Sequence, residues 1–326
     1  FPSDSSFVPT MTLFAFVFPG QGSQSVGMLD AWADHPEVAE TLREASDALG
    51  EDVGRLIKEG PKEALALTTN TQPVMLIAGV AAWRVWRSEG GALPAVVAGH
   101  SLGEYSALVA SGVLTLAQAA PLVRFRAAAM QEAVPVGTGA MAAILGMSSA
   151  EVIAGCAEVQ AAMGAGSMEV VEAVNFNDPM QTVIAGSKAA VEKACEVLKA
   201  NGAKRALPLP VSAPFHSSLM KPAAEKLKLR LADTAFAAPQ IPVLNNIDVA
   251  VETNALRIQD ALYRQAFGPV RWVECVSAMK ARGVSTLVEC GPGKVLAGMV
   301  KRIDADMSGV ALFDPATLAD VKTLLA

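Results

Sequence analysis

Short apolar runs separated by helical patterns constrain the fold of this chain more than any other feature. Residues 13–18 (LFAFVF) are apolar throughout and end at a Pro-Gly pair, and residues 95–98 (AVVA) end at Gly99. Strands that are apolar at every position are typical of a parallel sheet covered on both faces. Helical patterns separate these two runs, at residues 36–49, 61–67 and 73–87. The order predicts an α/β fold with a hydrolase-like core, in which helices flank a parallel sheet.

The middle of the chain has shorter elements in a different order. The sequence predicts β-α-β-β-α-β at residues 141–145, 150–163, 169–174, 181–185, 189–201 and 204–208. This is the order of a ferredoxin-like unit. The α/β pattern then resumes, with strands predicted at 242–245 and 286–289. We therefore expect a large α/β domain from residues 11–133 and 211–326, a small ferredoxin-like subdomain at 134–210, and a disordered leader or cloning remnant at 1–10.

Charge and cysteine content argue against several classes of function. The 26 Lys and Arg residues against 32 Asp and Glu residues give a net charge of −6, so no overall positive field attracts nucleic acid or a membrane. The longest uninterrupted apolar stretch, residues 73–83, is shorter than the about 20 residues that a membrane-spanning helix needs. No basic residue precedes Arg43, which argues against a signal peptide.

The four cysteines form no CxxC pair and lie near no histidine, which argues against zinc and a disulfide framework. We expect them to be buried thiols, and we expect the protein to be cytoplasmic.

The motif best suited to chemistry is GHSLG at residues 99–103. It directly follows the predicted strand 95–98 and directly precedes a helical pattern at 102–110, which is the context of a nucleophile elbow. Glycines on both sides let the chain turn tightly, so that the Ser101 hydroxyl projects from the sheet edge and the Leu102 N–H faces a reacting carbonyl. The alternative interpretation is a serine that caps a helix.

A serine nucleophile needs a base, and the chain contains three histidines. His100 precedes Ser101 in a sharp turn that aims its ring away, and His35 belongs to a helix start at the surface. His216, in the loop SAPFHS after the small subdomain, is therefore the candidate base. No triad carboxylate is evident from the sequence, and a backbone carbonyl could orient the ring instead.

Two further features lie near these elements. The loop PGQGSQ at 19–24 lacks the third glycine of a dinucleotide fingerprint, so it is either a simple turn or the source of a second oxyanion N–H beside Ser101. Arg124 and Arg126 lie two residues apart in a helix predicted at 116–133, so only one can point inward. A buried arginine needs an anionic partner, either a nearby Glu or a substrate carboxylate.

Taken together, these segments resemble the malonyl-CoA:acyl-carrier-protein transacylase family of bacterial type II fatty acid synthesis. The resemblance runs from residue 11 to the C-terminus. Its motifs are FVFPGQGSQ (16–24), GHSLGEYSAL (99–108), MQEAVPVGTGAMAA (130–143), VNFN (174–177), KRALPLPVS (204–212) and GPGKVL (291–296).

The resemblance implies a role for each matching residue. Ser101 is the nucleophile, His216 is the general base, and the backbone N–H groups of Gln21 and Leu102 form the oxyanion hole. It selects Arg126 rather than Arg124 to bind the malonyl carboxylate. It also implies that the main-chain carbonyl of Gln265 orients the histidine, and that the aromatic Phe215 favours malonyl as the acyl group.

The activity so implied is ping-pong transfer of a malonyl group from malonyl-CoA to the phosphopantetheine thiol of acyl carrier protein, for fatty acid elongation. We expect a monomer with no permanently bound cofactor and no metal. Because carrier proteins are acidic, we expect a local basic patch drawn from Lys204, Arg205, Lys221, Lys294, Lys301 and Arg302.

Three alternatives remain open. A serine thioesterase or hydrolase would share the elbow, although its histidine normally lies late in the chain after an acid, whereas here no histidine follows His216. The others are an acyltransferase for another acyl-CoA and a non-catalytic scaffold that binds the carrier protein.

Overall fold

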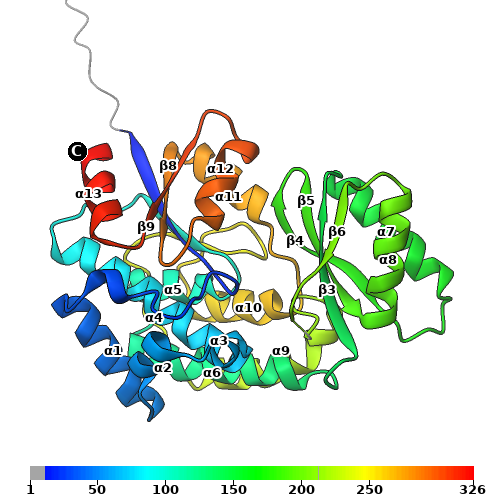
Figure 1. Ribbon diagram of the computed structural model, residues 1–326, viewed down its shortest axis with the longest axis horizontal. Helices are drawn as coiled ribbons and strands as arrows, with labels where there is room; N and C mark the ends of the chain where they lie inside the picture. Colours follow the sequence, from blue (N-terminus) through cyan, green and yellow to red (C-terminus); the bar gives the residue numbers. More distant parts are fainter. Residues whose placement is uncertain (1–11, 212) are drawn as a thin grey trace, which may run out of the picture.

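In the computed structural model, which describes residues 12–211 and 213–326, the strands form two separate sheets (Figure 1). The first sheet is parallel in the order β7-β2-β1-β8-β9, and the second is antiparallel in the order β4-β5-β3-β6. The predicted leader at residues 1–10 lies outside the described residues.

The parallel sheet forms the centre of the larger part. Its strands are β1 (Leu13–Phe18), β2 (Val96–Gly99), β7 (Val243–Leu244), β8 (Val284–Cys290) and β9 (Ser308–Leu312). The central strand β1 alternates between two cores: Phe16 packs with Trp83 and Trp86 on one face, while Ala15 and Val17 belong to the cluster on the other. The prediction of a strand buried on both faces is therefore confirmed.

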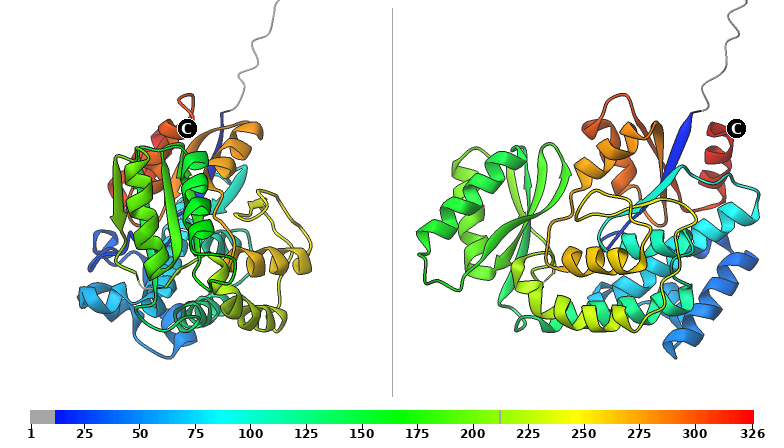
Figure 2. Two further views of the ribbon diagram at one scale, coloured as in Figure 1. Left: turned by 90° about the vertical axis from the view of Figure 1, so that its right-hand side faces the viewer. Right: turned by 180° about the vertical axis from the view of Figure 1, so that it is seen from behind.

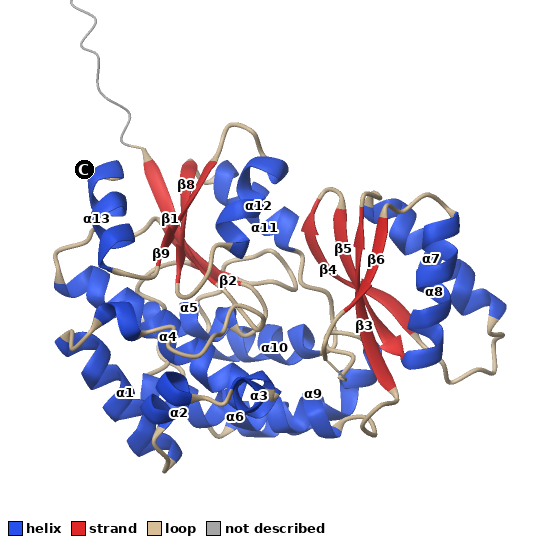
Figure 3. Ribbon diagram, viewed as in Figure 1, coloured by secondary structure: helices blue, strands red, loops and turns tan. Residues whose placement is uncertain are grey.

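Helices cover both faces of this sheet (Figure 3). Helices α11 and α12 pack on the face that holds Ala15 and Val17, and the other helices contribute to the larger core. The helices of this part are α1 (Pro36–Leu49), α2 (Val53–Glu59), α3 (Lys62–Ala66), α4 (Thr68–Ser88), α5 (Gly103–Ala110), α6 (Leu116–Glu132), α9 (Lys221–Ala232), α10 (Ala255–Ala266), α11 (Trp272–Ala281), α12 (Val295–Ile303) and α13 (Pro315–Leu324), with the short 3₁₀ helices η1 (Asp30–Trp32) and η2 (Ser218–Met220).

The small antiparallel sheet has the predicted ferredoxin-like chain order β3-α7-β4-β5-α8-β6. Its elements are β3 (Gly139–Leu145), α7 (Ser149–Ala162), β4 (Val171–Asp178), β5 (Gln181–Ser187), α8 (Lys188–Ala200) and β6 (Arg205–Pro208). Figure 2 shows the two helices on the outer face of this sheet, where they enclose a core of their own. The opposite face joins the larger core through Met141, Val174 and Val183. The domain boundaries at 134 and 210 stay a prediction.

Several predicted element bounds were wrong. The helix predicted at 73–87 begins instead at Thr68, so Pro73 lies inside it. Pro73 has no N–H to donate to the Thr69 carbonyl, and this carbonyl accepts a hydrogen bond from the Arg124 Nε at 3.2 Å instead, which lets the helix extend past the proline. The strand predicted at 169–174 runs instead from Val171 to Asp178. No element was predicted for the segments that form α2, α9, β9 and α13, and of these β9 is a partly exposed edge strand made largely of small residues.

The structure also bears on the cysteines and on membrane and metal binding. In the described part of the chain all four cysteines are free; three are buried, but Cys195 is only half-buried, so the expectation of four buried thiols was wrong for it. No helix among the described residues is long and apolar enough to cross a membrane. The same residues contain no group of three or more His, Cys, Asp or Glu side chains that could hold a metal ion.

Candidate active site

Ser101 lies in the tight turn between β2 and α5, at the carboxyl edge of the parallel sheet. Its φ is +54°, in the left-handed region that few residues other than glycine adopt. A Cβ at Gly99 would lie 1.8 Å from the Gly103 carbonyl carbon, and one at Gly103 would lie 2.0 Å from the Phe18 oxygen. The turn is therefore possible only because both positions are glycine.

Ser101 and His216 form a close hydrogen-bonded pair. Ser101 Oγ is 2.7 Å from His216 Nε2, and His216 Nδ1 is 2.8 Å from the main-chain oxygen of Gln265 on α10. A carbonyl can only accept, so Nδ1 carries the proton and Nε2 is free to accept the serine proton. Burial, followed by the positive charge of Arg126, lowers the pKa of His216 to about 3, so the ring is neutral at physiological pH.

Arg126, on α6, is 1% exposed, and its guanidinium carbon lies 5.4 Å from the centroid of the Tyr105 ring. Its Nη1 donates to Gln72 Oε1 at 2.6 Å, and its Nη2 donates to Gln265 Oε1 at 2.9 Å and to Ser101 Oγ at 3.3 Å. Its Nε is buried with no hydrogen-bond partner in the described chain. Burial lowers the pKa of this guanidinium, because the charged form is poorly solvated. A buried cation whose hydrogen-bond partners are all neutral is well suited to receive an anionic ligand.

Arg124 lies outside this cavity although it is only two residues away. Its guanidinium forms an ion pair with Glu51 and contacts α4. The two arginines thus point in different directions, and Arg126 is the one beside Ser101.

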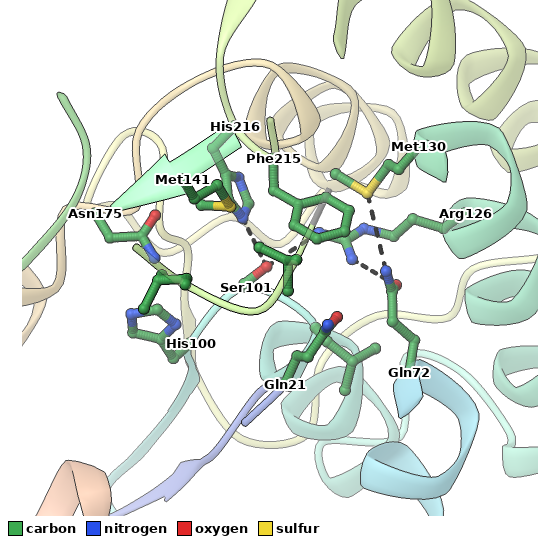
Figure 4. A pocket seen from close by; sticks show the side chains of 13 residues that line it. Gln21, Gln72, His100, Ser101, Arg126, Met130, Met141, Asn175, Phe215 and His216 are labelled. Carbon is green, nitrogen blue, oxygen red and sulfur yellow. Dashed lines mark hydrogen bonds between the residues drawn. The ribbon is translucent and has the colours of Figure 1, made fainter. Parts of the chain in front are cut away.

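The cavity around Ser101 is small, and Figure 4 shows Arg126 and Gln72 on one side of Ser101, with His100 and Asn175 on the other. Its volume is about 120 Å³, well below the roughly 300–1,000 Å³ of typical pockets for drug-sized ligands. A short acyl group fits this space, whereas a CoA nucleotide does not. The lining residues are Gln21, Gln72, His100, Ser101, Leu102, Arg126, Met130, Met141, Asn175, Leu209, Val211, Phe215 and His216.

Gln21 and Leu102 approach Ser101 from two neighbouring strand ends. Gln21 follows β1, and its side-chain Oε1 accepts a hydrogen bond from Thr68 Oγ1 at 2.9 Å. Leu102 directly precedes α5, where the positive end of the helix dipole favours negative charge. Gln21 therefore lies in the loop after β1, and Leu102 lies in the nucleophile turn itself, directly after Ser101. A second hollow of about 240 Å³ adjoins the cavity and shares Gln21 and His100 with it.

The other two histidines have structural contacts. His100 Nε2 lies 2.8 Å from Asn177 Oδ1 on β4, and its ring packs against Trp272 with centroids 5.6 Å apart. His35 precedes α1, and its Nδ1 accepts a hydrogen bond from the Glu37 N–H at 3.2 Å. Neither ring makes a hydrogen bond with Ser101 Oγ among those found in the described chain.

Sequence reasoning missed several residues around the pair. Gln72 and the side chain of Gln265 hold Arg126, and Asn246 holds the backbone of Ser101. Glu104, buried one turn after the nucleophile, accepts a hydrogen bond from the Asn246 N–H, and burial raises its pKa to about 7. Asn246 had one signal in the sequence, since it lies just past a predicted strand, but nothing indicated which strand lies beside it.

Comparison with known proteins places this geometry in a family. The acyl transferase domain family matches residues 15–313. The malonyl CoA-acyl carrier protein transacylase of Salmonella typhimurium is 55% identical over 96% of this chain and 100% of its own length. That of Bacillus subtilis is 44% identical over 94% of this chain and 96% of its own length.

Solved structures agree with these relatives. The acyl-carrier-protein S-malonyltransferase of Burkholderia pseudomallei is 62% identical and superposes with a TM-score of 0.92 over 96% of this chain and 100% of the other. A malonyl-transacylase solved in complex with a type II polyketide synthase acyl carrier protein is 51% identical, with a TM-score of 0.91 over 94% and 98% of the two chains. The chain therefore belongs to the family of malonyl-CoA:acyl-carrier-protein transacylases.

Proposed function

We propose that this protein transfers a malonyl group from malonyl-CoA to the phosphopantetheine thiol of acyl carrier protein through a malonyl-serine intermediate, and so supplies fatty acid elongation. One observation carries the proposal. Ser101 Oγ lies 2.7 Å from the candidate base His216 and 3.3 Å from the buried Arg126, inside a cavity of acyl-group size. A nucleophile, a base and a carboxylate-binding cation thus converge on one atom.

In the first half-reaction Ser101 Oγ attacks the thioester carbon of malonyl-CoA while His216 Nε2 takes the hydroxyl proton. The carbonyl oxygen becomes an oxyanion, which the backbone N–H groups of Gln21 and Leu102 stabilise. Each such donor contributes about 10²–10³ in rate. The carbon–sulfur bond then breaks, the CoA sulfur takes the proton from His216, and the malonyl-serine ester remains.

The second half-reaction runs the same steps in reverse with another thiol. The phosphopantetheine thiol gives its proton to His216 and its sulfur attacks the ester carbon. The carbon–oxygen bond to Ser101 breaks, and Oγ recovers the proton from His216. The main-chain oxygen of Gln265 accepts the hydrogen bond from Nδ1–H in both the neutral and the protonated ring, so it orients the imidazole without a buried carboxylate.

Arg126 supplies the selectivity for malonyl. Its guanidinium lines the cavity beside Ser101, where the free carboxylate of a malonyl group on Ser101 would meet the two terminal nitrogens that now donate to Gln72 and Gln265. Phe215 and the other apolar side chains of the cavity enclose the short acyl chain. An uncharged acyl group would leave Arg126 with neutral partners only.

The acidic carrier protein would dock beside the mouth of this site. The six candidate basic residues are all exposed, but Arg302 pairs with Asp178 and Lys221 lies near Glu225. We favour Lys204, Arg205, Lys294 and Lys301, which form none of the ion pairs found in the described chain. We further propose that the protein is a cytoplasmic monomer without a permanently bound cofactor.

Intact-protein mass spectrometry after brief incubation with malonyl-CoA tests the proposal. We expect a malonyl-sized mass increase on the wild type and on Ser106→Ala, and none on Ser101→Ala. Ser106 is the matched control because it is a buried serine on α5, directly after the nucleophile turn. Release of CoA without any adduct would favour the thioesterase alternative, and an adduct on Ser101→Ala would refute the assigned nucleophile.

A further inference from the structure

The side chain of Asn246 spans the nucleophile turn. Asn246 follows β7 and is completely buried. Its Oδ1 accepts a hydrogen bond from the Ser101 N–H at 2.9 Å, and its Nδ2 donates to the Gly99 carbonyl at 2.7 Å. These two backbone groups lie on either side of His100, so one carboxamide satisfies both ends of the turn.

This pattern continues the ladder of the parallel sheet. Strand β2 pairs with β7 in the register Val97↔Val243 and Ala98↔Leu244, which extrapolates to His100 opposite Asn246. In a parallel ladder a residue bonds the carbonyl before and the N–H after the residue that it faces. The carboxamide of Asn246 makes these two bonds in place of a backbone peptide group. The left-handed φ of Ser101 takes this segment out of strand geometry, so a side chain rather than a neighbouring strand's backbone bonds to the turn.

A second amide side chain, that of Gln265, links the nucleophile turn to the base. Gln265 Nε2 donates to the Ser101 carbonyl at 3.0 Å and to Asn246 Oδ1 at 3.4 Å, while the Gln265 main-chain oxygen holds His216. The Asn246 N–H in turn donates to Glu104 Oε1 at 2.7 Å. Nucleophile and base are thus held by one hydrogen-bonded network whose centre is Asn246.

We propose that Asn246 is a positioning residue for the transfer reaction: it fixes the Ser101 backbone so that Oγ faces His216 and the Leu102 N–H faces the oxyanion. The inference rests on the proposed function. Asn246 is absent from the lining of the cavity, so it acts through Ser101 rather than on the substrate. A displacement of about 1 Å at a reacting atom can cost about 10²-fold in rate.

The first test compares Asn246→Ala with Asn245→Ala. Asn245 is the matched control because its side chain accepts only from the Asp248 N–H and makes no contact with the turn among the hydrogen bonds found in the described chain. We expect Asn246→Ala to lower kcat for malonyl transfer by about 10- to 100-fold, with KM for malonyl-CoA changed by less than about twofold. The rate of malonyl-serine formation should fall in parallel, and Asn245→Ala should match the wild type.

The second test is the pH profile of Asn246→Asp. A protonated aspartic acid can donate to the Gly99 carbonyl and accept from the Ser101 N–H, whereas an ionised one can only accept. We therefore expect its kcat, relative to that of Asn246→Ala, to rise as the pH is lowered. The neighbouring titratable and charged groups are His100, Glu104, Arg126, His216, Asp248 and Cys275. Because both variants contain all of them, the ratio of the two kcat values reports on position 246 alone.

The outcomes separate this inference from the proposed function. If the wild type forms no malonyl-serine, the proposed function fails. If the wild type forms it and folded Asn246→Ala forms it equally fast, or shows only a raised KM, the positioning role is refuted. Should Asn246→Ala fail to fold, the ratio of Asn246→Asp to wild type decides, and a ratio that does not rise at low pH overturns the inference.

Discussion

Removal of the Arg126 side chain should separate malonyl transfer from acetyl transfer. In the structure the guanidinium is 1% exposed, and its hydrogen-bond partners are the neutral oxygens of Gln72, Gln265 and Ser101. A malonyl carboxylate brings a charge to this cation, whereas an acetyl group brings none. In Arg126→Ala the carboxylate would therefore be buried without a partner, and the malonyl ester should suffer far more than the acetyl ester.

The magnitude follows from the kind of hydrogen bond that is lost. A hydrogen bond to a charged group contributes about 1.5–3 kcal/mol, and each 1.36 kcal/mol changes a rate constant by about tenfold. The ratio of kcat/KM for malonyl-CoA to that for acetyl-CoA should thus fall by about 10- to 150-fold. Arg126 also touches Ser101 Oγ, so both donors should share a smaller loss that cancels in the ratio.

The assay measures CoA release or carrier acylation with each donor, at several donor concentrations. Arg124→Ala is the matched control, because Arg124 lies two residues away on α6 and pairs with Glu51 outside the cavity. Its donor ratio should equal that of the wild type. Equal losses on both donors in Arg126→Ala would refute the assignment of Arg126 to the malonyl carboxylate.

Two further predictions concern stability. Burial lowers the pKa of His216 from 6.5 to about 3 in the folded chain, so the stability that the neutral ring contributes is present above about pH 6.5 and is lost as the pH falls toward 3. In urea unfolding, the free energy of unfolding of His216→Gln should therefore fall less steeply with falling pH than that of the wild type, by at most about 1.4 kcal/mol per pH unit. Equal slopes for the two proteins would contradict the burial of a neutral histidine. Gly103→Ala should lower the free energy of unfolding by about 1–3 kcal/mol or more, because its Cβ would lie 2.0 Å from the Phe18 oxygen. Gly298→Ala, where a Cβ on α12 would meet open space, should raise the free energy of unfolding by up to about 1 kcal/mol. Equal melting temperatures for the two variants would refute the claim that the turn requires glycine at position 103.

The parts of the fold that could be predicted from the sequence are those that depend on the residues of a single segment. A fully apolar run such as residues 13–18 has few alternatives to a strand buried on both faces, and both its position and its burial agree with the prediction. The β-α-β-β-α-β order was equally legible, because each element carries its own periodicity. The start of α4 could not be read in this way. The Thr69 carbonyl, which Pro73 leaves without a helical donor, accepts a hydrogen bond from Arg124, and Arg124 lies 55 positions after Thr69 in sequence.

The candidate site likewise combines features set by one segment with features set by contacts between distant segments. The sequence by itself determined the turn at Ser101, because GxSxG directly after a strand permits one tight geometry, and elimination among three histidines led to His216. Only the tertiary structure decided what surrounds them: that Gln72 and Gln265 hold Arg126 with neutral oxygens, and that Asn246 completes the ladder beside His100. These contacts join residues between 54 and 147 positions apart, and spacing along a chain carries no information about which distant strands become neighbours in the sheet.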